Sequence, residues 1–381
     1  MRIALDALPL VSSRMTGIGY CEAGQVQAMM MLHPEEQYVL QFFDKGDGAE
    51  KRKRLYYYEQ QRNVSVRQGH FSGYLYRLMT TAIPLPYRAF FGKDVDITHF
   101  FNYIIPPGVA GKRIVTVHDM VYKTFPETVR GRTRFMLESG LQRSLHRADL
   151  IVTDSEFSKT EIIRYFPATE ERIRVVPCGV DKLRFSPMPP AAAPAIEELK
   201  RRMHLQANYF LYLGTLEPRK NLDRLIRAYA LLKQQHPDAP GGYGWRNNHI
   251  YQLVQTLHLE DDVLFTEYVP EEDVQPLLCG AMAFVFPSVY EGFGMPPLEA
   301  MACGTPVLTT RAASLPEVVG DAAVIVDPHH TEDIAQGLEK LFLDAALRER
   351  LQKEGLRRAA MFSWENAAAA LYDVYQEALT R

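Results

Sequence analysis

The feature that most constrains this chain is the alternation of short β-rich runs with longer segments of helical pattern. Such alternation predicts parallel sheets with helices on both faces. In the first half we expect strands at 2–6, 38–43, 96–100, 113–118, 150–153 and 173–177, and helices at 18–32, 131–147 and 156–165. In the second half we expect strands at 209–214, 263–267, 283–287, 306–310 and 322–326, and helices from Asn221 and at 331–343, 346–361 and 363–379.

The chain of 381 residues, 47% of them hydrophobic, is long enough for two packed domains. The segment "SPMPPAAAPAIEE", residues 186–198, is rich in proline and alanine and is the best linker candidate. We therefore predict an α/β fold of two doubly wound domains, residues 1–187 and 188–362, with a ligand cleft between the carboxyl edges of their sheets.

One stretch does not fit this scheme. After "LLKQQHPDAP" the chain continues directly with "GGYGWRNNHI". A doubly wound domain needs a buried strand between these two helices, and we find none between Pro240 and Gly241. A natural deletion or a missing segment explains this equally well.

Composition excludes several classes of protein. A net charge of −3 and a pI near 6.4 give no sign of a nucleic-acid partner. The four cysteines, Cys21, Cys178, Cys279 and Cys303, form no CxxC pair or Cys/His cluster, so the spacing indicates neither a disulfide framework nor a zinc site. No apolar run approaches the roughly 20 residues of a membrane span. We expect a cytoplasmic protein that is soluble or at most peripheral to the membrane.

The segment "EGFGMPPLEAMACGTPV", 291–307, follows an apolar strand and begins a helix. Backbone amides in the glycine turn are expected to point into the cleft and to bind hydroxyl or phosphate oxygens: those of Gly292, Phe293, Gly294 and Met295. Glu291 and Glu299 suit paired hydrogen bonds from the vicinal hydroxyls of a sugar and a ribose. Taken alone, the segment is better explained as a tight turn with one solvated glutamate and one glutamate at the start of a helix; the other motifs change this preference.

A second segment, "YLGTLEPRKNLDRLI", predicts a strand, a loop and a helix in the same domain. Arg219 and Lys220 precede the helix, and two cations beside free amides make a diphosphate site. A basic surface loop is the alternative interpretation.

Two motifs of the first half also lie at predicted strand ends. In "RMTGIGYCEAG", Gly17 and Gly19 permit a phosphate to approach the backbone, although the third glycine of a dinucleotide-binding turn is absent. In "VTVHDM", His118 is placed to bind a substrate hydroxyl, and a structural core histidine is an equal alternative.

Together "TGIGY", "VTVHDMVY", "TDSEFSK", "VVPCGVD", "YLGTLEPRKNL", "FPSVYEGFGMPPLEAMACGTPV" and "SLPEVVGDAAV" resemble the retaining glycosyltransferases of family 4. The resemblance covers nearly the whole chain and implies the GT-B fold, in which two Rossmann-like domains face each other across a cleft. It also implies that the last helix, 363–381, packs back on the N-terminal domain. The "GTLEPRKN" version is similar to that of bacterial mannosyltransferases of lipopolysaccharide and exopolysaccharide assembly.

The resemblance implies a role for each residue. Glu299 holds the ribose of the donor, and Glu291 with the amides of the glycine turn holds the hexose. Arg219 and Lys220 neutralise the leaving diphosphate. The remaining expected contacts to the nucleotide sugar are His118 with a sugar hydroxyl, the Gly17–Gly19 loop near the diphosphate, Leu298 beside Glu299, and Thr215, which stands where many members carry arginine.

The implied reaction moves a hexose, most simply mannose from GDP-mannose, to a hydroxyl of a saccharide or lipid-linked saccharide with retention. No metal and no cofactor is expected, because the two cations serve the leaving group and no DxD motif is suitably placed. The alternatives are a UDP- or dTDP-sugar donor and a non-catalytic relative, which only the absent strand supports. A nicotinamide-dependent oxidoreductase and a nucleotide-sugar epimerase fit the motifs poorly.

The acceptor side has a clue of its own in residues 51–93. This segment has nine cations and a single acid, Glu59, with aromatic residues interleaved. It predicts docking on an anionic membrane surface that carries a lipid-diphosphate acceptor. A solvated basic face over core aromatics is the alternative.

Overall fold

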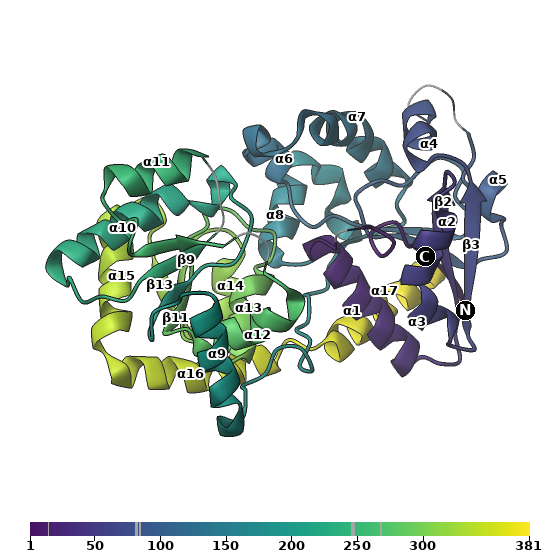
Figure 1. Cartoon of the computed structure of the whole chain (residues 1–381). Helices are drawn as coiled ribbons and strands as arrows, with labels where there is room; N and C mark the ends of the chain where they lie inside the picture. Colours follow the sequence, from purple (N-terminus) through teal and green to yellow (C-terminus); the bar gives the residue numbers. More distant parts are fainter. Residues whose placement is uncertain (14, 81–82, 84, 245–247, 267–268) are drawn as a thin grey trace. The chain divides into compact units, whose positions relative to one another are not determined.

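The computed structural model describes residues 1–381 except 14, 81–82, 84, 245–247 and 267–268 (Figure 1). The chain divides into two compact units, Met1–Gly179 with Trp364–Arg381, and Val180–Ser363. The expected linker 186–198 is wrong, because most of it folds as the helical turn η3 (Pro190–Ala192) and helix α9 (Ala193–Arg202) of the second unit. Alanine, glutamate and leucine favour a helix there, and its proline lies in the first turn, where it is tolerated.

The first unit contains a seven-stranded parallel sheet in the order β3-β2-β1-β4-β5-β6-β7. Its strands are β1 (Arg2–Asp6), β2 (Gln37–Asp44), β3 (Val64–His70), β4 (Ile97–Phe100), β5 (Lys112–Thr116), β6 (Leu150–Thr153) and β7 (Ile173–Val175). β3 was not expected, because its polar, half-exposed sequence VSVRQGH carries no apolar run. The order changes direction at β1 and β4, where doubly wound folds bind ligands.

Helices cover both faces of this sheet. They are α1 (Gly17–Leu32), α2 (Gly48–Arg54), α3 (Tyr56–Glu59), α4 (Gly73–Met79), α5 (Arg88–Phe91), α6 (Val121–Thr124), α7 (Gly131–Arg147), α8 (Glu156–Tyr165) and α17 (Trp364–Thr380), with the turns η1 (Pro126–Thr128) and η2 (Pro167–Arg172). Neighbouring strand residues face opposite sides: Ile114 joins the core under α1 and α17, and Val115 joins the core under α7. This alternation explains why the strands read as continuous apolar runs.

The last helix belongs to the first unit, as Figure 1 shows for α17 beside α1. Leu371 and Tyr375 lie in the same core as Ile3 and Val26. The Tyr375 hydroxyl is 2.8 Å from Nδ1 of the buried His99. Residues more than 270 positions apart therefore share one apolar core.

The second unit contains a six-stranded parallel sheet in the order β10-β9-β8-β11-β12-β13. Its strands are β8 (Phe210–Leu211), β9 (Gly242–Gly244), β10 (Val263–Phe265), β11 (Ala283–Phe286), β12 (Val307–Thr310) and β13 (Val324–Val326). The expectation of a missing strand is wrong, because β9 pairs with both β8 and β10. With the sequence GYG it offers no apolar run to recognise. Glu267, at the end of an expected strand, lies outside the described residues.

The helices of the second unit are α9, α10 (Leu222–Gln235), α11 (Asn248–Thr256), α12 (Glu271–Gly280), α13 (Met295–Ala302), α14 (Leu315–Val319), α15 (Thr331–Leu343) and α16 (Ala345–Ala360), with the turn η4 (Pro218–Lys220). α10 packs on α15, α13 on α16 and α9 on α12. Within the described parts of the chain, we find no helix with the length and apolar character that a membrane crossing requires.

Candidate active site

The glycine turn of the second unit connects β11 to α13. Gly294 immediately precedes α13 with φ of 120°, and a Cβ there would lie 2.9 Å from the Leu315 side chain, so a larger residue would be strained. Among the described residues, the amides of Phe293, Gly294 and Met295 donate no backbone hydrogen bond. They sit at the N-terminus of a helix, where an anionic or hydroxyl oxygen is favoured.

Both predicted cations lie against one predicted carboxylate. Glu291 is 8% exposed, and its two oxygens accept from Arg219 Nη1 at 2.9 Å and from Lys220 Nζ at 2.6 Å. Arg219 also donates to the Tyr290 carbonyl at 3.0 Å and to Glu217 at 2.7 Å. Segments about 70 residues apart in sequence are thus joined by a buried charge cluster at the carboxyl end of β11.

Two polar residues that sequence reasoning missed hold this cluster in place. Asn221 adopts the left-handed conformation, with φ of 62°, and its amide donates to the carbonyls of Pro287 at 3.1 Å and Pro328 at 2.7 Å. The Ser314 hydroxyl bonds the carbonyls of Glu291 at 2.9 Å and Phe293 at 2.7 Å. Asn221 follows Lys220 directly and Ser314 begins "SLPEVV", so both lie in the motifs, but nothing in the pattern indicates their partners.

The charges of the cluster shift one another's pKa values. Burial alone raises the pKa of Glu291, but the adjacent Lys220 and Arg219 outweigh it and hold that pKa below its ordinary value. For Lys220 burial prevails over the attraction of Glu291, so its pKa is lowered. Glu291 therefore stays ionised, and it acts as the counter-ion of two cations that an incoming diphosphate would also attract.

Glu299 lies in α13, apart from this charge cluster. Burial raises its pKa to about 7, and the charge of Arg184 only partly opposes the shift. No hydrogen bond to its carboxylate is found among the described residues. A carboxylate with free acceptors at a helix near the turn fits the predicted contact to vicinal hydroxyls, which stays a prediction.

The other two residues predicted in this unit, Leu298 and Thr215, have structural surroundings that explain them. Leu298 is fully buried in α13. The Thr215 hydroxyl donates to Glu217 at 3.0 Å, and the Thr215 carbonyl accepts from the Tyr212 hydroxyl at 2.8 Å. Thr215 therefore helps to fix the loop that precedes Arg219.

In the first unit the predicted glycines begin α1. A Cβ on Gly17 would meet nothing within 4 Å, so the backbone there is open to a ligand. A Cβ on Gly19 would lie 3.3 Å from the Pro9 carbonyl oxygen. A side chain at 19 would therefore be tight against the loop after β1, whereas Gly17 keeps an approach to the backbone open.

His118 follows β5 and has two partners within its own unit. Its Nδ1 is 2.6 Å from Asp154 Oδ2, and its Nε2 is 2.8 Å from the Phe101 carbonyl. Burial lowers the pKa of His118, but Asp154 outweighs it and raises that pKa to about 10. Both ring nitrogens are engaged, so the predicted contact to a sugar hydroxyl requires one of these bonds to be exchanged. Asp154, in "TDSEFSK", was not predicted as a partner.

The basic character of 51–93 is weaker than its composition indicates. Acids outside the segment pair with three of its cations: Asp47 with Lys51, Glu50 with Lys53 and Asp94 with Arg67. Arg52 pairs with Glu59. The side chain of Arg77 lies outside the described part of the chain. Many of the aromatics, including Tyr76, Tyr87 and Phe91, are core residues, whereas Tyr56 and Tyr57 are exposed.

Comparison with protein families gives the same two-part division. Residues 197–358 match the family of glycosyl transferases group 1, and residues 39–184 match glycosyltransferase family 4. The O-antigen chain mannosyltransferase B of Escherichia coli is 38% identical over 288 residues, which cover 74% of each chain. The chain belongs to the family-4 glycosyltransferases. This membership supersedes the oxidoreductase and epimerase alternatives, and the presence of β9 removes the only support of the non-catalytic alternative.

Other relatives of this family-4 glycosyltransferase agree. The serotype-specific mannosyltransferase WbdA of E. coli is 32% identical over 268 residues, 68% of this chain but 33% of that relative, so the chain spans about a third of WbdA. Among solved structures, a sucrose-phosphate synthase from Thermosynechococcus elongatus superposes with a TM-score of 0.72 over 99% of this chain at 19% identity. Anabaena HepE in complex with UDP and glucose superposes with a TM-score of 0.72 over 99% of this chain at 18% identity. These likenesses establish the GT-B fold.

Proposed function

We propose that this glycosyltransferase moves mannose from GDP-mannose to a hydroxyl of a saccharide or lipid-diphosphate-linked saccharide, with retention at the anomeric carbon. The observation that carries the proposal is the buried set of Arg219, Lys220 and Glu291 on the glycine turn, in which the amides of Phe293, Gly294 and Met295 donate no backbone hydrogen bond among the described residues. Two cations and a helix N-terminus match a leaving diphosphate.

Donor binding exchanges one anion for another. The diphosphate binds Arg219 and Lys220 in place of Glu291. The Glu291 carboxylate then accepts hydrogen bonds from the hexose hydroxyls, and the turn amides donate to hexose oxygens. Glu299 accepts hydrogen bonds from the ribose hydroxyls. His118 donates from Nε2 to a hexose hydroxyl in place of the Phe101 carbonyl. The cations are held in position before the donor arrives, so their orientation costs little at the moment of reaction.

The chemical step breaks the bond between the anomeric carbon and the diphosphate oxygen. The acceptor hydroxyl forms the new bond on the same face of the sugar, and its proton passes to the departing phosphate oxygen. Negative charge grows on the diphosphate as the bond breaks. Arg219 and Lys220 stabilise that charge, and we assign no metal to the leaving group and no cofactor to the reaction.

The choice of mannose rests on the relatives. The two E. coli proteins quoted above are both named mannosyltransferases, one of the O-antigen chain and one serotype-specific. The name of the first, which mentions the O-antigen chain, supports a saccharide acceptor of the lipopolysaccharide type. We place the enzyme at the cytoplasmic face of the membrane, held peripherally through 51–93, because exposed Tyr56 and Tyr57 adjoin the basic helix α2.

The test is a transfer assay with the full chain, GDP-mannose and a set of lipid-diphosphate-linked mannosides, with the product analysed by proton NMR. The proposal expects a new α-mannoside, because the α-linked mannose of the donor keeps its configuration. A β-mannoside would contradict retention. Transfer from UDP- or dTDP-sugars but not from GDP-mannose would replace the donor by that alternative.

A further inference from the structure

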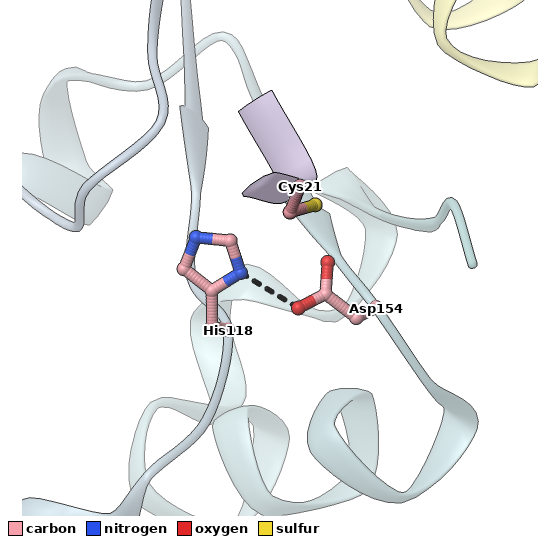
Figure 2. A group of neighbouring side chains, drawn as sticks. All are labelled: Cys21, His118 and Asp154. Carbon is pink, nitrogen blue, oxygen red and sulfur yellow. Dashed lines mark hydrogen bonds and ion pairs between the residues drawn. The ribbon is translucent and has the colours of Figure 1, made fainter. Parts of the chain in front are cut away.

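Three buried side chains of the first unit bring metal-binding atoms together, and a fourth, Cys178, adjoins one of them. Cys21 lies in the first turns of α1, and His118, Asp154 and Cys178 follow β5, β6 and β7. One ligand atom each of Cys21, His118 and Asp154 lies within 4.8 Å of the others. Figure 2 shows these three side chains together. The sulfur of Cys178 is 3.2 Å from that of Cys21. All four side chains are buried.

The contacts around these atoms are those of a ligand set. Nε2 of His118 faces the Phe101 carbonyl, which fixes the ring with Nδ1 toward the cluster, the usual arrangement of a metal-binding histidine. The Oδ1 atom of Asp154 is buried without a hydrogen-bond partner among the described residues. In Figure 2 this oxygen points toward Cys21. A buried carboxylate oxygen without a partner is costly, and a cation would satisfy it.

We propose that Cys21, Cys178, His118 Nδ1 and Asp154 bind one zinc ion in a closed tetrahedral site. Two thiolates, one imidazole and one carboxylate are a typical zinc donor set. Bond lengths of about 2.3 Å to sulfur and about 2.0 Å to nitrogen and oxygen place the two sulfurs roughly 3.8 Å apart and Nδ1 about 3.3 Å from the carboxylate oxygen. The observed 3.2 and 2.6 Å are slightly shorter, so these two pairs move apart by a few tenths of an ångström for each side chain on binding. Cys178 lies next to Cys21 but outside the group of atoms within 4.8 Å of one another, so its side chain moves further to complete the tetrahedron.

Zinc binding releases protons, because thiolate and neutral imidazole are the ligand forms. Two protons leave the thiols and one leaves the His118–Asp154 pair. Binding therefore weakens as the pH falls.

The site would act on the fold around the proposed donor contacts. Cys21 stands two residues after Gly19, so the ion ties the first turns of α1 to the carboxyl ends of β5, β6 and β7. It also fixes the ring of His118 through Nδ1 and leaves Nε2 available for exchange. This role is structural: it positions His118, whose contact to the hexose rests on the proposed function, and it takes no part in the leaving-group chemistry.

The sequence pattern did not indicate a zinc site. The four residues of the proposed site are spread over 158 positions, from Cys21 to Cys178, with no CxxC or short Cys/His spacing. Their common position becomes visible only when β5, β6 and β7 align in parallel. Asp154 directly follows β6, His118 and Cys178 come two and three residues after β5 and β7, and Cys21 is the fifth residue of α1.

The experiment measures metal in the full chain, produced with added zinc and purified with reductant and without chelator. The proposal expects about one zinc per chain by mass spectrometry, and a thiolate-to-cobalt charge-transfer band after exchange with cobalt. Cys21→Ser and Cys178→Ser each lose at least tenfold in zinc content. Cys279→Ser, a matched control in the second unit, retains it.

Two results overturn the proposal. One is wild-type protein without zinc and without a cobalt band, whether the two thiols are reduced or joined as a Cys21–Cys178 disulfide. The other is a double variant, Cys21→Ser with Cys178→Ser, that binds as much zinc as the Cys279→Ser control. The wild-type measurement decides by itself if the serine variants do not fold.

Discussion

The substitution Glu291→Gln separates two roles of one carboxylate. Glutamine keeps the size of the side chain and one acceptor oxygen but removes the charge that balances Arg219 and Lys220. The ligand-free protein then contains two adjacent cations without that counter-ion, and Lys220 is 7% exposed. A diphosphate supplies the missing charge. We therefore expect the variant to be less stable alone and to bind inorganic pyrophosphate more tightly than the wild type.

The size of the effect follows from burial. Removing one partner of a buried ion pair costs about 3–5 kcal/mol, and the amide oxygen that remains places this variant near about 3 kcal/mol. For a unit of the size of Val180–Ser363 this lowers Tm by roughly 6–12 °C. Because pyrophosphate no longer competes with Glu291, its affinity rises at least tenfold, which is about 1.4 kcal/mol. The rate of mannose transfer falls, because the hexose loses its contact with the Glu291 carboxylate.

The assay is thermal unfolding with and without pyrophosphate, followed by calorimetric titration. Glu217→Gln is the matched control: Glu217 also binds Arg219, but its side chain is 35% exposed, so its loss costs less than about 1 kcal/mol. An unchanged Tm for Glu291→Gln together with unchanged pyrophosphate affinity would refute the reasoning. It would mean that Glu291 does not neutralise the two cations.

Three further expectations follow. Lys220→Ala lowers kcat roughly 10²–10³-fold, as removal of a preorganised charge-stabilising donor does; near-native turnover contradicts its role at the leaving group. Folded Glu299 has a pKa of about 7 against about 4.3 unfolded, so it destabilises the chain increasingly from pH 4.3 to 7. Glu299→Gln should thus gain stability over wild type at pH 8 and little at pH 4, while losing nucleotide affinity; equal pH profiles in denaturant titrations reject this. Vesicles with anionic lipid should co-sediment the chain more than neutral vesicles, and Tyr56→Ser with Tyr57→Ser should reduce binding; no lipid dependence removes the membrane proposal.

The sequence predicted the order of most elements because parallel strands buried on both faces leave continuous apolar runs, as in β6 and β11. It failed where that signal is absent. β9 is three residues of GYG, and β3 is half exposed. The proline-rich segment 186–198 was misread as a linker, because prolines near the start of α9 are compatible with a helix.

At the candidate site the sequence predicted the residues but not their partners. The motif around Glu291 and the pair Arg219 and Lys220 were each recognised, yet their mutual contact links positions about 70 residues apart. The pairing of His118 with Asp154 likewise depends on the adjacency of β5 and β6. Among the charge pairs of 51–93, the contact of Arg67 with Asp94 needs the three-dimensional structure, whereas Asp47 with Lys51 and Glu50 with Lys53 are neighbours at helical spacing.

The most direct test of the central claim is a thermal-shift screen against GDP, UDP, dTDP and ADP and their common sugar conjugates. A ligand at 100 times its dissociation constant adds about 2.7 kcal/mol of stability, which is readily measured. The account predicts stabilisation by GDP and more by GDP-mannose, and loss of both effects in Lys220→Ala. Stabilisation by another nucleotide alone, or no response to any of them, would contradict GDP-mannose as the donor held at this site.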